Sequence, residues 1–277
     1  VGHGTMTATT TGANNTACGY LALNALTTGS RNTAIGFAAL DTQTTASYNT
    51  AVGYNGLTAN TSGVENTAVG QAALDANTTA SHNTAIGSQA LSGTTTGSAN
   101  TAVGRASLVF NTTGINNVAV GYNSLYNNTT GYQNVAIGRD ALGSNTSANN
   151  NVAVGYNAIG ANTTGIGHVA VGYAALDANT TANYNTAVGF NALTANTTGA
   201  NNVSMGSYAL DDNTTGNHCT GVGYGALSAN TTGGANVALG THALIVNTVG
   251  VNNTAIGSYA LDSATNASNN TAVGYDA

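Results

Sequence analysis

The chain has 277 residues, of which only 4% are charged, and it contains no Pro, Trp or Lys. Its net charge of −6 at pH 7 argues against nucleic-acid binding, and no apolar run approaches the length of a membrane span. Asn, Thr, Gly and Ala dominate, a composition unlike that of globular enzymes and unlike that of charged, proline-rich disordered segments.

A glycine recurs every 17 residues along the chain, at the end of a phrase that commonly reads Asn-Thr-Ala-Val-Gly. No insertion or deletion interrupts the spacing. A strict period of this kind predicts a solenoid, in which each repeat forms one coil that stacks on the next. These register glycines are Gly2, Gly19, Gly36, Gly53, Gly70, Gly87, Gly104, Gly121, Gly138, Gly155, Gly172, Gly189, Gly206, Gly223, Gly240, Gly257 and Gly274.

Some positions within the repeat are nearly constant. The residue four after the register glycine is Leu in 14 of 16 copies, the exceptions being Met6 and Ile159, and the residue before the glycine is apolar throughout. Both positions are predicted to lie in the core. Asn stands four before the glycine in 14 of 16 copies, with His168 and Cys219 as exceptions, and is predicted to form an inward amide ladder. The residue five before the glycine varies freely and should face solvent.

The local pattern predicts strands. Gly, Asn, Thr and Val suit helices poorly, and helical repeats are longer than this one. Alternation in Thr-Ala-Val-Gly indicates a short strand with the Thr and the Val on one face. The predicted fold is all-β, a parallel β-solenoid (β-roll) of about 16 coils, each of 17 residues, with Leu57, Leu74 and Leu91 in one column. Residues 1–277 are expected to form a single continuous array, as a segment of a longer chain or as a filament subunit.

One corner of the repeat carries two kinds of residue. Asp occurs five after the register glycine in five copies, never in adjacent coils, which fits stacking because opposed like charges are destabilising. Four of these copies carry Ala ten after the glycine, where most copies carry Gly. We predict two turn geometries at this corner, with positive φ reserved for Gly. The Asp copies are Asp41, Asp75, Asp177, Asp211 and Asp262, and the Ala residues are Ala46, Ala80, Ala182 and Ala267.

The phrase Asn-Val-Ala-Ile-Gly at Asn134–Gly138 resembles the head repeat of trimeric autotransporter adhesins. The 17-residue unit is also similar to repeats of bacteriophage tail fibres and of uncharacterised bacterial surface proteins. The resemblance covers the whole chain, although the adhesin heads use a shorter repeat that lacks the Ala-Asn-Thr-Thr-Gly segment. It implies a left-handed parallel β-roll, often trimeric, outside the cell or on a virion.

No residue pattern predicts catalysis, so we expect no enzyme activity, no cofactor and no metal site. A metal needs convergent ligands, and the carboxylates form no acid–base pair. The glycine-rich phrases lack the Lys of a phosphate-binding loop. Cys18 and Cys219 should lie about 12 coils apart, beyond disulfide reach, with Cys18 in the core. The histidines are widely spaced: His3, His82, His168, His218 and His242.

An aromatic stripe is the first candidate functional surface. The residue after the register glycine is aromatic in nine copies. Such a stripe could stack on sugars or seal contacts between chains, or it could only pack between coils and stiffen them. Its members are Tyr20, Phe37, Tyr54, Tyr122, Tyr156, Tyr173, Phe190, Tyr224 and Tyr275.

The Asn-Thr-Thr or Asn-Thr-Ser triplets are the second candidate surface. They match the acceptor of N-glycosylation, but Asn and Thr also satisfy their own backbone in turns. The Thr that follows each Asn forms a third row, which could order water as ice-binding solenoids do. The candidate acceptors are Asn60, Asn77, Asn111, Asn128, Asn145, Asn162, Asn179, Asn196, Asn213 and Asn230.

Taken together, these patterns predict a structural protein of an extracellular fibre or surface appendage, forming a rigid rod of stacked coils. The alternatives are an adhesin or tail-fibre shaft that binds host glycans, and an ice-binding solenoid. The expected partners are other copies of the chain, as a homotrimer or an end-to-end filament, with glycans as further candidates. Neither nucleic acid nor membrane insertion is expected. The expected location is extracellular, on a cell surface or on a virion appendage.

Overall fold

A computed structural model describes residues 2–277, and Val1 lies outside the described residues. The chain divides into two compact units, Val1–Ile137 and Gly138–Ala277. Each unit repeats one element, a three-residue strand followed by turns, and the described residues contain no helix.

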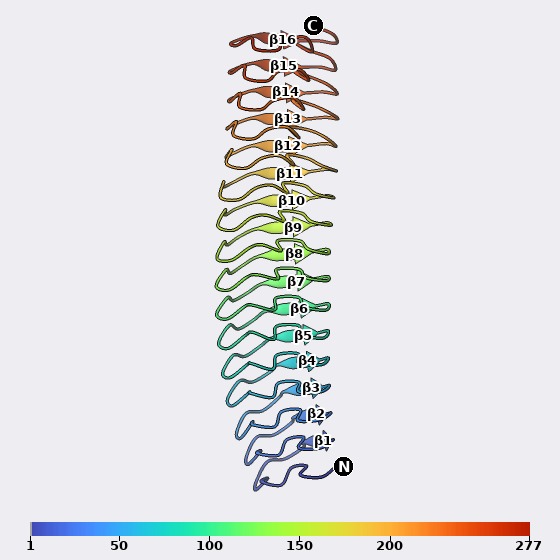
Figure 1. The fold of residues 1–277 in the computed structure, drawn as a ribbon, viewed down its shortest axis with the longest axis vertical. Helices are drawn as coiled ribbons and strands as arrows, with labels where there is room; N and C mark the ends of the chain where they lie inside the picture. The colour runs from blue at the N-terminus through green and yellow to red at the C-terminus, as the bar shows by residue number, and fades with distance from the viewer. Residues whose placement is uncertain (1) are drawn as a thin grey trace. The chain divides into compact units, whose positions relative to one another are not determined.

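The first unit stacks eight strands in chain order (Figure 1). Each strand pairs in parallel with the next at a shift of 17 residues, so that Thr50 lies opposite Thr67 and Val52 opposite Val69. The strands are β1 (Thr16–Cys18), β2 (Thr33–Ile35), β3 (Thr50–Val52), β4 (Thr67–Val69), β5 (Thr84–Ile86), β6 (Thr101–Val103), β7 (Val118–Val120) and β8 (Val135–Ile137).

The second unit repeats this arrangement, with Val169 opposite Thr186. Its strands are β9 (Val152–Val154), β10 (Val169–Val171), β11 (Thr186–Val188), β12 (Val203–Met205), β13 (Thr220–Val222), β14 (Val237–Leu239), β15 (Thr254–Ile256) and β16 (Thr271–Val273). The predicted fold class, a parallel β-solenoid of 17-residue coils, is confirmed in both units.

The Leu column is also confirmed. Leu57, Leu74 and Leu91 are each fully buried. Leu57 and Leu74 donate their backbone N–H groups to the equivalent carbonyls of the next coil, those of Ala73 and Ala90, at 3.0 Å. Leu57 has φ 50°, a left-handed conformation that an L-residue rarely adopts. The hydrogen bond between coils and the complete burial of the side chain offset this conformational strain.

The orientation of the strands differs from the prediction. The central Ala points inward, as Ala51 and Ala68 do with no exposed surface, and the residue before the register glycine points outward. Ile35 and Ile86 are thus exposed, and Cys18 is exposed rather than in the core. The interior of so short a coil is narrow, and Ala fits beside Leu where Val or Ile would overfill the space.

Glycine is required where successive coils approach most closely. Gly36 has φ 138°, and a Cβ added there would lie 2.2 Å from the carbonyl oxygen of Gly53. The corner ten residues further on is different, because neither Gly63 nor Ala46 has positive φ. The prediction that Gly is chosen at this corner for positive φ is therefore wrong.

Candidate functional surfaces

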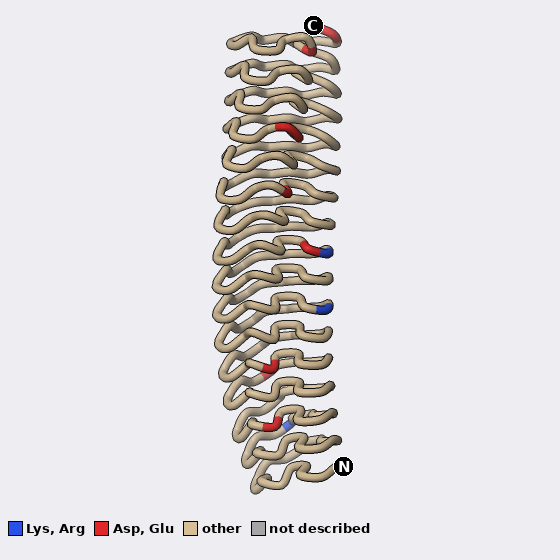
Figure 2. Tube along the Cα trace, viewed as in Figure 1, with Lys and Arg blue, Asp and Glu red and all other residues tan. Residues whose placement is uncertain are grey.

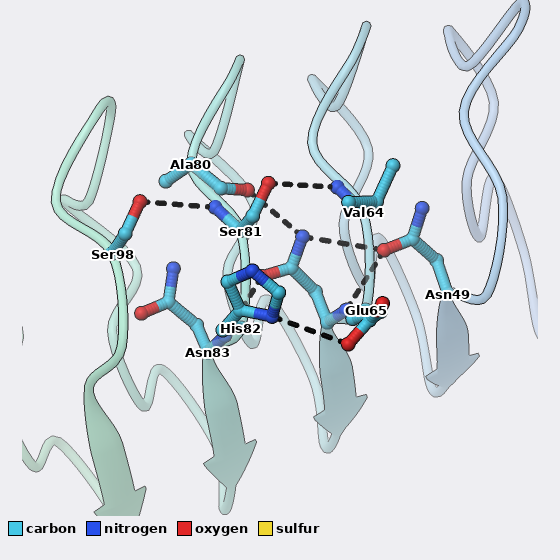
Figure 3. A network of polar contacts seen from close by, with 9 residues as sticks. Asn49, Val64, Glu65, Ala80, Ser81, His82, Asn83 and Ser98 are labelled. Atoms are coloured by element: carbon cyan, nitrogen blue, oxygen red, sulfur yellow. Dashed lines mark hydrogen bonds and ion pairs between the residues drawn. The ribbon is translucent and has the colours of Figure 1, made fainter.

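The Asn residues four before the register glycine form a buried ladder in each unit, here called the first Asn ladder. Asn66 donates its backbone N–H to Asn49 Oδ1 at 2.9 Å and its Nδ2 to the carbonyl oxygen of Ala80, also at 2.9 Å. Figure 3 shows this network between adjacent coils. The Oδ1 of Asn66 in turn accepts the backbone N–H of Asn83 in the next coil at 3.0 Å. These amides therefore hold adjacent coils together.

The candidate glycosylation residues form a second Asn ladder. Asn77 donates Nδ2 to Asn60 Oδ1 at 2.8 Å and to the carbonyl oxygen of Ala80 at 3.2 Å. All ten are fully buried: Asn60, Asn77, Asn111, Asn128, Asn145, Asn162, Asn179, Asn196, Asn213 and Asn230. A glycan on Nδ2 has no room in this packing. The geometry therefore favours the turn-chemistry interpretation of the triplets over glycosylation.

His168 and Cys219 substitute for Asn in the first ladder, and both are fully buried. His168 Nδ1 accepts the backbone N–H of Asn185 at 3.1 Å, and its Nε2 lies 2.7 Å from the carbonyl oxygen of Ala182. Burial lowers the pKa of His168 to about 4 and raises the pKa of the Cys219 thiol. Both residues are explained as ladder members, which gives them a structural role.

Two rows of Thr residues occur in the repeat, one in a turn and one at the start of each strand. In the row that follows the second Asn ladder, Thr61 donates Oγ1 to the carbonyl oxygen of Thr78 at 3.0 Å. Thr61 and its neighbour Ser62 are both exposed, whereas in the next coil Thr78 is half-buried and Thr79 is exposed. The Thr residues that open the strands, such as Thr50 and Thr67, are half-buried on the sheet's outward side.

The nine residues of the aromatic stripe are all exposed. In the first unit Tyr20, Phe37 and Tyr54 stack ring on ring, with centroids 5.2 and 5.1 Å apart. In the second unit Tyr156 and Tyr173 stack in the same way at 5.1 Å. Stacked rings cover one another's faces and leave mainly their edges to solvent, so these contacts support packing between coils more directly than stacking on sugars.

The structure adds three rings that the sequence interpretation missed: Tyr208, His242 and Tyr259. They stand two residues after a register glycine. In these three coils the residue directly after the glycine is not aromatic but is Ser207, Thr241 or Ser258. They complete an unbroken series of eight rings in the second unit: Tyr156, Tyr173, Phe190, Tyr208, Tyr224, His242, Tyr259 and Tyr275. The sequence signal for this series is one aromatic ring per coil at either the first or the second position after the register glycine.

The charged residues lie outside the strands, on the turns (Figure 2). His82 Nδ1 lies 3.2 Å from a carboxylate oxygen of Glu65 in the adjacent coil, with both side chains exposed, and Arg31 donates to the hydroxyl of Tyr48. The row to which these four residues belong is exposed as predicted. Because exposed charged pairs contribute little to stability, these two contacts should add little to the free energy of unfolding.

The Asp row contains the carboxyl with the largest resolved pKa shift. Burial, with a smaller contribution from the charge of Asp212, raises the pKa of Asp211 to about 6. Burial also raises the pKa of Asp75 and of Asp177, whose Oδ1 accepts a hydrogen bond from Asn157 Nδ2 at 2.7 Å. Asp211 Oδ1 is buried without a partner. Across residues 2–277, no three His, Cys, Asp or Glu side chains gather into a group able to hold a metal.

These features define the class of the protein as a parallel β-solenoid with ladders of Leu, Asn, Thr and aromatic side chains. No model of a known protein family matches the chain, and no curated protein matches it. No helix long and apolar enough to cross a membrane occurs in the described part of the chain.

Proposed function

We propose that the chain is a structural protein of an extracellular fibre or surface appendage, and that it has no enzymatic activity. The observation that carries the proposal is the use of the polar side chains: the Asn residues of both ladders bond a neighbouring coil, as Asn66 bonds Asn49 and Asn77 bonds Asn60. A chain whose repeated amides bond neighbouring coils resists bending and unwinding. Resistance of this kind is what a shaft requires.

The low content of charged residues and the resemblance of the repeat support a location outside the cell. Only 4% of the residues are charged, and the repeat resembles those of adhesin heads and tail fibres. A cell surface or a virion appendage is the location proposed. The partners proposed are further copies of the chain, as a homotrimer or as a filament, and the coil would be left-handed as in the adhesin heads.

Electron microscopy and fibre diffraction of the purified protein test this function. We expect straight, unbranched particles with an axial spacing of about 4.8 Å, the distance between paired strands. Flexible or collapsed particles would contradict a structural role. Hydrolytic or transfer activity that is lost on mutation of particular side chains would contradict the absence of catalysis.

An adhesin or tail-fibre shaft that binds host glycans is the second candidate. The specific observation that favours it is the exposure of the aromatic stripe, which is 52% at Tyr54 and Tyr224 and 77% at Tyr275. Binding of short, discrete particles to defined sugars on a glycan array would support this alternative. The same particles without any sugar binding would support the structural role alone.

An ice-binding solenoid is the third candidate. It is favoured by the six consecutive strands β1–β6, which each present a Thr on the outward side of the sheet. Inhibition of ice recrystallisation by the purified protein, lost in a Thr50→Glu/Thr84→Glu variant, would support it. Recrystallisation at the rate seen in buffer alone would exclude it.

A further inference from the structure

The outward side of the strands carries a column of apolar residues that the sequence interpretation placed in the core, beside a column of Thr and Val. We define the outer sheet face as the first and third residues of the strands, in each unit separately. Its first residues are Thr or Val, and its third residues are Val, Ile, Leu, Met or Cys. Ile86 is 42% exposed and Met205 is 44% exposed, values that are high for large aliphatic side chains.

The size of this face is considerable for a protein surface. Eight strands at about 4.8 Å spacing and three residues at about 3.3 Å give each unit a face of about 400 Å². Thr stands at the first position of ten of the sixteen strands, so the apolar part of each face is chiefly the column of third residues. Apolar patches on the surface of a monomer often mark interaction sites. Each unit thus offers about half of the roughly 800 Å² that one partner contributes to a standard protein interface.

The shape and charge of the face limit what can cover it. No residue of the sixteen strands is charged, so neither an acidic nor a basic partner is selected. Branched aliphatic side chains recur at the third position of every strand except β1 and β12, for example Ile35, Val52 and Val69. A partner fits every strand at once only if it repeats with the same spacing, and a second copy of this chain does so by construction. Two identical uncharged faces also meet without electrostatic repulsion.

We propose that the outer sheet face is a lateral interface between two copies of this chain, packed sheet against sheet. The inference rests on the proposed structural function and deepens it by naming the surface through which the fibre gains thickness. The sheets would lie about 10 Å apart, with the third residues of the strands interdigitating as in packed β-sheets. The residues placed at the centre of this contact are Ile86 in the first unit and Met205 in the second.

Substitution of the two central residues of the full chain tests the interface. The variant Ile86→Glu/Met205→Glu buries two unpaired charges in the contact and should raise the dissociation constant at least about a hundredfold. The control Ala99→Glu/Asn201→Glu adds the same charge in the exposed row that already contains Glu65. Sedimentation equilibrium should show wild-type and control chains associated and the Ile86→Glu/Met205→Glu chain monomeric, all with the same circular dichroism spectrum.

Two outcomes would overturn the inference: a wild-type chain that stays monomeric, or an Ile86→Glu/Met205→Glu chain that associates as the wild type does. If that variant fails to fold, Ile86→Thr/Met205→Thr places a residue already common on this face at both sites. It should still weaken association about tenfold. Straight particles of monomer width in electron micrographs would leave the structural function intact while rejecting the lateral interface, so the two failures are distinguishable.

Discussion

His168 Nδ1 accepts the backbone N–H of Asn185 at 3.1 Å, the bond that an Asn Oδ1 accepts elsewhere in the first Asn ladder. Its Nε2, at 2.7 Å from the carbonyl oxygen of Ala182, takes the place of Nδ2. The imidazole therefore reproduces both hydrogen bonds of Asn, but only as the neutral tautomer with its proton on Nε2. Protonation puts a second donor opposite the N–H of Asn185.

The first prediction is that His168 makes the second unit sensitive to acid. Its pKa is about 4 in the fold and 6.5 in the unfolded chain, so the unfolded chain binds the proton first. The free energy of unfolding should fall as the pH drops from 6.5 towards 4, by about 3 kcal/mol over this interval. Denaturant unfolding at several pH values should show this loss in the wild type and a much weaker dependence in His168→Asn.

The matched control is His218→Asn, because His218 is exposed and Asn201 already occupies the equivalent position. It should retain the acid sensitivity of the wild type. Equal pH dependence of the wild type and His168→Asn would show that the buried imidazole is not the sensitive group.

The second prediction concerns the strength of the first Asn ladder. Asn83→Ala leaves the backbone N–H of Asn100 and the carbonyl oxygen of Gly97 without their partner. A buried unsatisfied group costs about 1–3 kcal/mol, so the free energy of unfolding should fall by about 3 kcal/mol. Asn116→Ala, in the exposed row where Ala99 also has positive φ, should change it by no more than about 1 kcal/mol in the same measurement. Equal effects of the two substitutions would argue against a stabilising ladder.

The third prediction is that Asp211 destabilises the folded chain at neutral pH. Its pKa is raised from 3.8 to about 6, chiefly by burial and secondly by the charge of Asp212. The fold therefore retains a proton that the unfolded chain releases, and the free energy of unfolding falls as the pH rises through this range. After allowance for solvent screening, Asp211→Asn should stabilise the protein by about 1 kcal/mol at pH 7 and by almost nothing at pH 3.

Asp262→Asn is the control for this measurement. Asp262 occupies the same row, and its Oδ1 accepts a hydrogen bond from Ser263 Oγ at 3.0 Å. Thermal unfolding at pH 7 should show a gain for Asp211→Asn alone. A gain that is equally large at pH 3 would mean that the carboxylate charge is not its cause.

The period of the sequence was sufficient to predict the class of fold, the Leu column and the Asn ladder. A repeat that places the same residue type at every 17th position indicates that equivalent residues of successive coils stack directly above one another. The period does not predict which face of each strand points into the core. Alternation in Thr-Ala-Val separates two faces without saying which is buried, and the larger side chain, Val, is the one expected inside. The narrow coil instead buries Ala51 and exposes Ile35.

The candidate surfaces were predictable only in part. The residue types of the aromatic stripe indicated exposed rings, but contacts such as that between Tyr208 and Tyr224 required the structure, because the two rings occupy different positions of the repeat. The triplet at Asn77 is the same whether its amide carries a glycan or bonds Asn60. Sequence alone does not report whether a polar atom is already engaged.

The last prediction separates the two interpretations of the aromatic stripe. Tyr173 contacts Tyr156 at 5.1 Å and Phe190 at 5.2 Å, both by stacking. Because an aromatic pair contributes about 0.5–1.5 kcal/mol, Tyr173→Ala should lower the free energy of unfolding by about 1–3 kcal/mol. Tyr184→Ala removes an equally large ring from the exposed row and should have a clearly smaller effect in denaturant unfolding. If Tyr173→Ala were as stable as Tyr184→Ala and lost binding to a glycan array, the rings would serve a ligand, and the packing role argued from their geometry would be wrong.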